Sequence, residues 1–131
     1  MRIAYKLRIY PNWQQEAKLD LTLETCRHLW NTALADRKIA YEQEGISRTY
    51  EDQAAMLVTE KQNGHFQGVH AQVFQDILRR LKKAFDNFFR RVKAGQKPGY
   101  PRFRSAGRFK SFTYLQSGFK IEGSKLTLSL R

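Results

Sequence analysis

The 131-residue sequence is poor in several features that would place it in familiar classes of protein. A single cysteine, Cys26, excludes an internal disulfide and a multi-cysteine zinc site. Because no run of 18 apolar residues occurs, no segment is expected to span a membrane. Neither a P-loop nor a dinucleotide-binding glycine pattern is present. The lone thiol suits a reducing compartment, so we expect a cytoplasmic protein.

Acidic residues are nearly absent from one stretch, Arg79–Lys110. This stretch holds 12 Lys and Arg but one acid, Asp86, for a net charge of +11, whereas the whole chain carries +12. Localised positive charge is typical of a surface that binds a polyanion. A basic run can also be a solvated face, but such a face usually mixes both signs of charge. The missing acids therefore favour contact with nucleic acid.

The acids present elsewhere do not predict a catalytic centre. A two-metal nuclease needs carboxylates that hold two cations about 3.5–4 Å apart. The chain's acidic pairs are instead expected on solvent-exposed faces of helices: Glu42 with Glu44, Glu51 with Asp52, and Asp76 with Asp86. His65 and His70 lack further ligands at zinc-binding spacing. We therefore expect no metal, no cofactor and no enzymatic activity in this chain.

Helical periodicity covers most of the first two thirds of the chain. A first helix is predicted from Trp13 to about Glu44, with Asn12 and Gln15 as its N-terminal cap and Gly45 at its end. A short second helix is predicted over about 50–62. Either Ser47 or Thr49 can cap it, and Thr49 with Asp52 has the spacing of a capping box. The first helix carries an inward stripe of Leu19, Leu23, Cys26, Trp30, Ala33, Leu34 and Tyr41, and the second turns Ala54, Leu57 and Val58 inward.

A third helix is predicted over residues 71–94, closed by Gly95. At 100° per residue its apolar side chains fall on one continuous arc, with a polar midline of Gln72, Arg79, Lys83 and Arg90 opposite. The expected buried arc consists of Val73, Phe74, Ile77, Leu78, Leu81, Ala84, Phe85, Phe88, Phe89 and Val92.

Residues 95–110, here called the basic linker, follow this helix. Gly95, Pro98, Gly99 and Pro101 are incompatible with a regular helix. Arginines alternate with aromatic residues, a composition that can follow a phosphate backbone while its rings stack on bases or seal a core. The alternating residues are Tyr100, Arg102, Phe103, Arg104, Arg108 and Phe109.

Strands are predicted at both ends of the chain. Residues 2–10 alternate strictly between apolar and polar side chains, as in a half-buried strand. Ser111–Leu115 is predicted as a strand, and Phe119–Glu122 with Lys125–Leu130 as a hairpin around Gly123-Ser124. The sequence ends directly after a strand pattern, which suggests a fragment boundary. We predict an α+β fold in which N- and C-terminal strands form a small antiparallel sheet or barrel around an inserted helical bundle.

Two long motifs resemble the TnpB/OrfB family of insertion-sequence proteins. The first is YKLRIYPNWQQEAKLDLTLETCRHLWNTALADRKIAY, with an R-I-Y-P strand exit and a C-R-x-x-W-N-x-A-L helix. The second is AQVFQDILRRLKKAFDNFFRRVKAGQKPGYPRFRS, followed by SFTY. The resemblance implies part of a transposon-encoded, RNA-guided DNA endonuclease of the kind long described as a transposase. It also implies a wedge domain from residues 1–11 and 107–131 and a recognition lobe at 12–106, without the RuvC-like nuclease and zinc-binding segments.

The same resemblance implies which residues contact nucleic acid. Family contacts to the short duplex motif beside the target correspond to Tyr50, Ala71, Gln75, Thr113 and Tyr114. An amide such as that of Gln75 can make a bidentate contact with adenine, although Gln75 could equally be a solvent-facing polar residue. With the basic positions, the predicted site is Tyr50, Gln72, Gln75, Arg79, Lys83, Arg90, Arg91, Lys97, Arg102, Phe103, Arg104, Arg108, Lys110, Thr113 and Tyr114.

Three functions compete at this point. The favoured one is a nucleic-acid-binding fragment, a monomer or weak dimer, whose partners are a guide RNA and DNA. The second is a stand-alone helix-turn-helix regulator or architectural protein, which would bind palindromic sites as a dimer. The third is a membrane-surface or protein-partner module built on the amphipathic helix 71–94. Burial of Phe85 and Phe88 would argue against the third.

Overall fold

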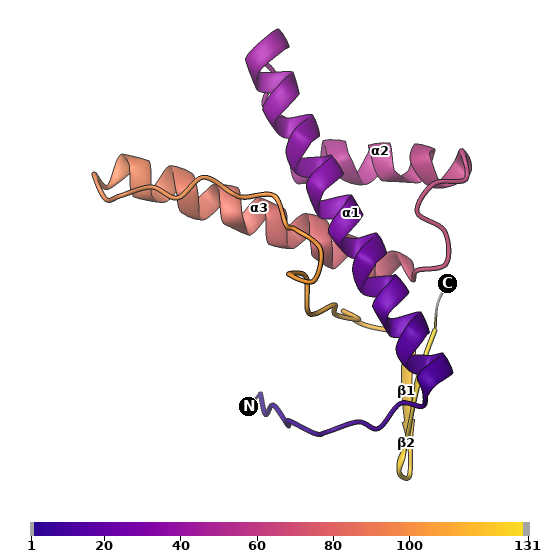
Figure 1. Cartoon of the computed structure of the whole chain (residues 1–131). Helices are drawn as coiled ribbons and strands as arrows, with labels where there is room; N and C mark the ends of the chain where they lie inside the picture. Colours follow the sequence, from indigo (N-terminus) through magenta and orange to yellow (C-terminus); the bar gives the residue numbers. More distant parts are fainter. Residues whose placement is uncertain (1, 130–131) are drawn as a thin grey trace.

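A computed structural model describes residues 2–129 and contains three helices and one hairpin within that range. The elements follow the order α1 (Trp13–Glu44), α2 (Tyr50–Gln62), α3 (Ala71–Lys93), β1 (Phe119–Glu122) and β2 (Lys125–Leu128). The long helix α1 crosses α3, α2 packs beside this crossing, and the hairpin lies near the first turns of α1 (Figure 1). The α+β class is confirmed. No helix within residues 2–129 is long and apolar enough to cross a membrane.

The helices begin where the capping residues predict. At α1 the Asn12 Oδ1 accepts from the Gln15 amide and the Gln15 Oε1 accepts from the Asn12 amide, both at 2.9 Å. Thr49 and Asp52 form the same reciprocal pair at α2. Gly45 ends α1 with φ of +65°, a left-handed conformation that favours glycine. At α3, His70 caps the helix through a hydrogen bond of 3.1 Å from the Gln72 amide to its Nδ1.

The core fills the crossing of the three helices. Cys26, Trp30, Ala33 and Leu34 of the predicted α1 stripe are buried, as is Leu57 of α2. Tyr41 and Val58, both expected inside, are exposed because they lie on faces that no other helix covers. From α3 the buried side chains are Val73, Phe74, Ile77, Leu78, Leu81 and Phe85.

Burial along α3 stops earlier than the apolar arc predicts. Phe88 is half-buried, and Phe89 and Val92 are 55% and 51% exposed. The reason is geometric, because the C-terminal half of α3 extends past α1 and only the basic linker accompanies it (Figure 1). The prediction of a fully buried arc to Val92 is therefore wrong beyond Phe85.

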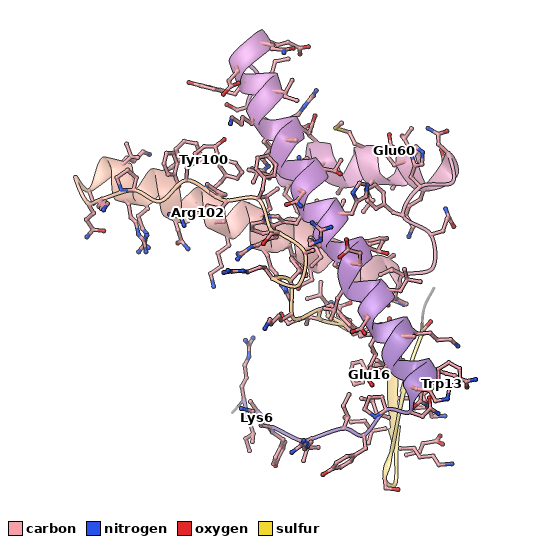
Figure 2. The ribbon with its side chains drawn as sticks, in the orientation of Figure 1. Lys6, Trp13, Glu16, Glu60, Tyr100 and Arg102 are labelled. Carbon is pink, nitrogen blue, oxygen red and sulfur yellow. The ribbon has the colours of Figure 1, made fainter. Side chains whose placement is uncertain are left out.

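The predicted N-terminal strand is not formed. Residues 2–10 are extended but irregular, and their apolar residues, Ile3, Tyr5, Leu7 and Ile9, are at least half exposed. Figure 2 shows Lys6 on this segment, well apart from the helices. A strand needs a partner for its backbone groups, and within residues 2–129 the hydrogen-bonded sheet consists of β1 and β2 alone.

The C-terminal hairpin is confirmed, but the strand before it is not. Phe119 pairs with Leu128 and Glu122 with Lys125 around the predicted turn. Residues 111–115 are irregular, since Phe112 and Tyr114 pack onto the core instead of pairing in a sheet. The predicted second strand extended to Leu130, which lies outside the described residues. Within those residues the sheet has two strands and is not a closed barrel.

Candidate nucleic-acid interface

A basic cleft of about 350 Å³ lies between α3 and the final part of the basic linker. Five of its lining residues are Lys or Arg and none is acidic, so the cleft is a strongly positive concavity. This concavity is called the basic cleft below. Its lining residues are Trp30, Arg80, Lys83, Ala84, Asn87, Arg104, Arg108, Phe109, Lys110 and Ser111.

The basic linker reaches the cleft by running back along α3. The Tyr100 ring meets Phe85 and Phe88 edge-on, with centroids 5.5 and 5.3 Å apart. Pro101 is buried, so this part of the linker lies against the protein and not in solvent. Figure 2 shows Tyr100 and Arg102 on the stretch that overlies α3. The linker is therefore docked, although its composition resembles that of a free loop.

One face of α1 binds the backbone of the linker. The Trp30 Nε1–H donates to the Arg102 carbonyl at 2.9 Å. The Asn31 Nδ2–H donates to the Arg104 carbonyl at 2.9 Å, and its Oδ1 accepts from the Arg104 amide at 2.8 Å. Arg27, which also pairs with Glu24, donates to the same Arg104 carbonyl at 3.0 Å.

The cations of the cleft differ in how they are used. Arg80 pairs with Asp76 at 2.8 Å and donates to Ser111 and Thr113, so it joins α3 to the chain after the linker. Lys83, Arg108 and Lys110 are exposed, and no carboxylate within residues 2–129 lies within 4.0 Å of them. These three cations are free to bind an anion.

Arg104 occupies a defined position at the wall of the cleft. Its guanidinium carbon lies 5.1 Å from the centroid of the Trp30 ring, within the range of a cation–π contact. The same residue is held through its backbone by Asn31. A charged side chain whose backbone and guanidinium group are both held in place loses little further conformational entropy when it binds a phosphate.

The structure brings together four predicted site residues, Lys83, Arg104, Arg108 and Lys110, in the basic cleft. Gln75 and Arg79 precede Lys83 at successive i+4 positions, so these three form one row on the exposed face of α3. The half-buried Tyr50 lies beneath Arg79, whose guanidinium carbon is 5.8 Å from its ring centroid. The other exposed predicted residues lie outside the cleft: Arg90, Arg91, Lys97, Arg102 and Phe103.

Three further predicted site residues hydrogen-bond through their side chains within the protein. Gln72, expected on the polar midline of α3, is partly buried, and its Oε1 accepts from the amides of Gln116 and Ser117 at 2.7 and 2.8 Å. The Thr113 hydroxyl accepts from Arg80 at 3.0 Å. The half-buried Tyr114 donates from its hydroxyl to the Ser129 carbonyl at 2.5 Å, and burial raises its pKa. Their roles toward nucleic acid stay predictions.

Sequence reasoning missed the residues that assemble the cleft. Arg80, Arg27, Trp30 and Asn31 act through contacts 31 to 77 residues away in the sequence. One signal was available: Arg27, Trp30 and Asn31 lie at i, i+3 and i+4 within the C-R-x-x-W-N motif and so share one helical face.

The remaining candidate groups for chemistry are used structurally. Burial raises the pKa of Cys26 to about 12, so its thiol stays protonated, as expected of a small core residue. Asp76 was expected on a solvent-exposed face, but its side chain is 15% exposed and pairs with Arg80. Within residues 2–129 no three His, Cys, Asp or Glu side chains are grouped to hold a metal ion.

Residues 1–45 match a family model described as a helix-turn-helix domain, HTH_OrfB_IS605. The chain is 32% identical over 130 residues to a "Putative RNA-guided DNA endonuclease" of Streptomyces pristinaespiralis, covering 96% of this chain. It is 31% identical over 122 residues to a protein of the same description, InsQ, of Escherichia coli K12, covering 91% of this chain. It spans 31% and 29% of the length of these two relatives.

These matches confirm the resemblance to part of a TnpB/OrfB-type protein. They also bear on the helix-turn-helix alternative. Within the described part of the matched range, the structure has one continuous helix, Trp13–Glu44, preceded by extended chain. Two helices joined by a short turn are absent from residues 2–45, so the geometry by which a helix-turn-helix regulator enters the major groove is not formed there.

Proposed function

Because this chain resembles part of an RNA-guided DNA endonuclease of the TnpB/OrfB type, we propose that it is the nucleic-acid-binding part of such an enzyme. Its ligands are the phosphate backbone of a guide RNA or its heteroduplex and a short DNA duplex beside the target. The observation that carries this proposal is the basic cleft, which is lined by five cations and no acid, and of which only Arg80 is paired with a carboxylate, that of Asp76. Phosphate contacts of this kind supply affinity and register, while base contacts supply sequence preference.

Within this proposal, the two surfaces of α3 have different tasks. Lys83, Arg104, Arg108 and Lys110 bind backbone phosphates in the basic cleft. Gln75 lies two helical turns before Lys83 on the exposed row and is free to reach a base edge in a duplex bound along α3. Exposed Phe103, on the linker beside the cleft, offers a ring on which an unpaired base can stack.

The first half of α3 argues against the membrane-surface hypothesis. An interfacial helix inserts its apolar face into lipid and must therefore expose it. Phe85 is 6% exposed, and the side chains before it on the apolar arc of α3 fill the protein core. Up to Phe85 this face is therefore occupied by α1 and α2. Beyond it Phe88 is half-buried against Tyr100, and Phe89 and Val92 are 55% and 51% exposed.

Salt dependence tests the proposal. On a duplex, log K falls with log salt at a slope of about −0.9 per phosphate contacted. Replacing Arg79, Lys83, Arg90 and Arg104 with Ala is expected to flatten this slope by about two to four units while the circular dichroism spectrum stays unchanged. The isotherms are measured for structured RNA, motif duplex and scrambled duplex at several salt concentrations.

The matched control removes the same charge elsewhere. Lys18, Lys38, Lys120 and Lys125 are exposed and lie outside the basic cleft, so replacing them with Ala should change the slope far less. Equal slopes for both quadruple variants would contradict the proposal, since affinity would then follow net charge and not the positions of the cations on α3 and the basic linker.

A further inference from the structure

The proposed binding surface uses only Trp30 of the C-R-x-x-W-N motif, as a wall of the cleft, yet three side chains of the motif converge on one short stretch of backbone. Arg27, Trp30 and Asn31 donate three hydrogen bonds to the backbone carbonyls of Arg102 and Arg104, and Asn31 accepts a fourth from the Arg104 amide, all at 2.8–3.0 Å. We propose that these three residues are a backbone clamp that positions Arg104 for phosphate binding. The inference rests on the proposed function, because it assumes that the cleft binds phosphate through Arg104.

The chemistry of Asn31 suits this task. A carboxamide carries a donor and an acceptor side by side, as a peptide group does. Asn31 uses both on one residue, donating to the Arg104 carbonyl and accepting from the Arg104 amide. It thereby pairs with Arg104 as a neighbouring strand would, and it satisfies both backbone groups of a residue that has no regular secondary structure.

Trp30 adds the second constraint. Its indole N–H holds the carbonyl of Arg102, and the face of the same ring lies under the Arg104 guanidinium. Asn31 therefore holds the backbone of Arg104, and Trp30 holds its guanidinium group. Trp30 itself is 4% exposed, so it acts on a ligand chiefly through Arg104.

The basic linker needs such a device because its own sequence gives it little order. Glycines and prolines prevent a helix, and the stretch around Arg104 is irregular and exposed. Without the clamp, binding a phosphate would also have to order this backbone. The cost of ordering one backbone residue corresponds to about a tenfold loss of affinity.

The test uses Asn31→Ala, with Thr32→Ala, exposed on the same helix, as the matched control. We expect Asn31→Ala to increase hydrogen exchange at the Arg104 amide and trypsin cleavage after Arg102 and Arg104. With a labelled motif duplex and a labelled structured RNA as probes, it should weaken binding about tenfold and flatten the salt slope by about one unit. Thr32→Ala should change none of these.

A double-mutant cycle separates positioning from general destabilisation. If the clamp acts through Arg104, Asn31→Ala combined with Arg104→Ala should weaken binding no more than the stronger single change. Fully additive losses with an unchanged salt slope would overturn the proposal, as would an Arg104 amide that exchanges at the wild-type rate in Asn31→Ala. Trp30→Phe, which keeps a ring and removes the N–H donor, should act in the same direction as Asn31→Ala and more weakly.

The readouts also separate this proposal from the proposed function. If the wild-type chain binds neither probe at any salt concentration, the proposed function fails and the positioning role fails with it. Amide exchange and proteolysis would in that case still decide whether the clamp holds the linker. If the wild type binds and Asn31→Ala changes only thermal stability, the clamp is structural and the positioning role is wrong.

Discussion

Two glutamines one turn apart on α3 have different surroundings. Gln72 is bound to the backbone before the hairpin, whereas Gln75 is exposed. We expect Gln75→Ala to cost about 1–3 kcal/mol of binding on the preferred duplex only, with the salt slope nearly unchanged, as for loss of a base contact. Binding isotherms for preferred and scrambled duplexes measure this.

Gln72→Ala is the control for that experiment. It removes an acceptor for two backbone amides, so it should lower the free energy of unfolding and affect both duplexes alike. An equal loss on both duplexes for Gln75→Ala would mean that Gln75 does not read sequence.

Gly118 is required by the way Tyr114 packs. Its φ is +93°, and a Cβ there would lie 2.7 Å from the Tyr114 ring. Gly118→Ala should therefore lower the free energy of unfolding by about 2–4 kcal/mol in urea titrations. Gly123, with φ of +58° and nothing within 4 Å, supplies the control, where Ala should cost about 1 kcal/mol. Equal losses of unfolding free energy for the two variants would show that the Tyr114 ring moves aside at little cost.

At the scale of elements, α3 is a core helix in its first half and a platform for the linker in its second. Phe74 is fully buried and Phe88 half-buried, with Tyr100 against it. Phe74→Ala should lower the free energy of unfolding by about 3–5 kcal/mol. Phe88→Ala should lower it by only about 1–2 kcal/mol, because less apolar surface is lost. Chemical denaturation compares the two, and a reversed order would place the core further along α3.

The elements also show what the sequence could predict. The bounds of α1 and α2 follow from local chemistry, since the caps at Asn12 and Thr49 and the stop at Gly45 act within one turn. Residues 2–10 have the alternation of a strand but no neighbour within the described chain to pair with. Strand pairing is a long-range event that a local pattern cannot report.

At the scale of the whole molecule, the sequence predicts the concentration of positive charge but not the cleft in which part of it gathers. The excess of basic residues over 79–110 is legible in the sequence. That Lys83 and Arg104 share a cleft depends on where the linker docks, and there its backbone accepts hydrogen bonds from Asn31 and Trp30 of α1. The family resemblance covered both partners of this contact without indicating that they meet.

Catalysis gives a prediction at this scale. We expect the chain by itself, with Mg²⁺ or Mn²⁺ added, to leave plasmid and labelled oligonucleotides uncut, because a two-metal mechanism needs clustered carboxylates. The carboxylates of Asp76 and Asp86 are each paired with a basic side chain. Gel assays over a range of metal concentrations check this. Metal-dependent cleavage that disappears on replacing the chain's own carboxylates would contradict it.

The contacts between α1 and the linker also bear on the order in which the protein folds. They join residues 72 to 77 positions apart, whereas each helix forms from neighbours in sequence. Closing so long a loop costs entropy before any contact repays it, and such contacts form slowly. The linker should therefore dock after the helices have met. A newly made chain would then acquire its charged concavity late, when the linker docks and the core around Trp30 and Phe85 closes.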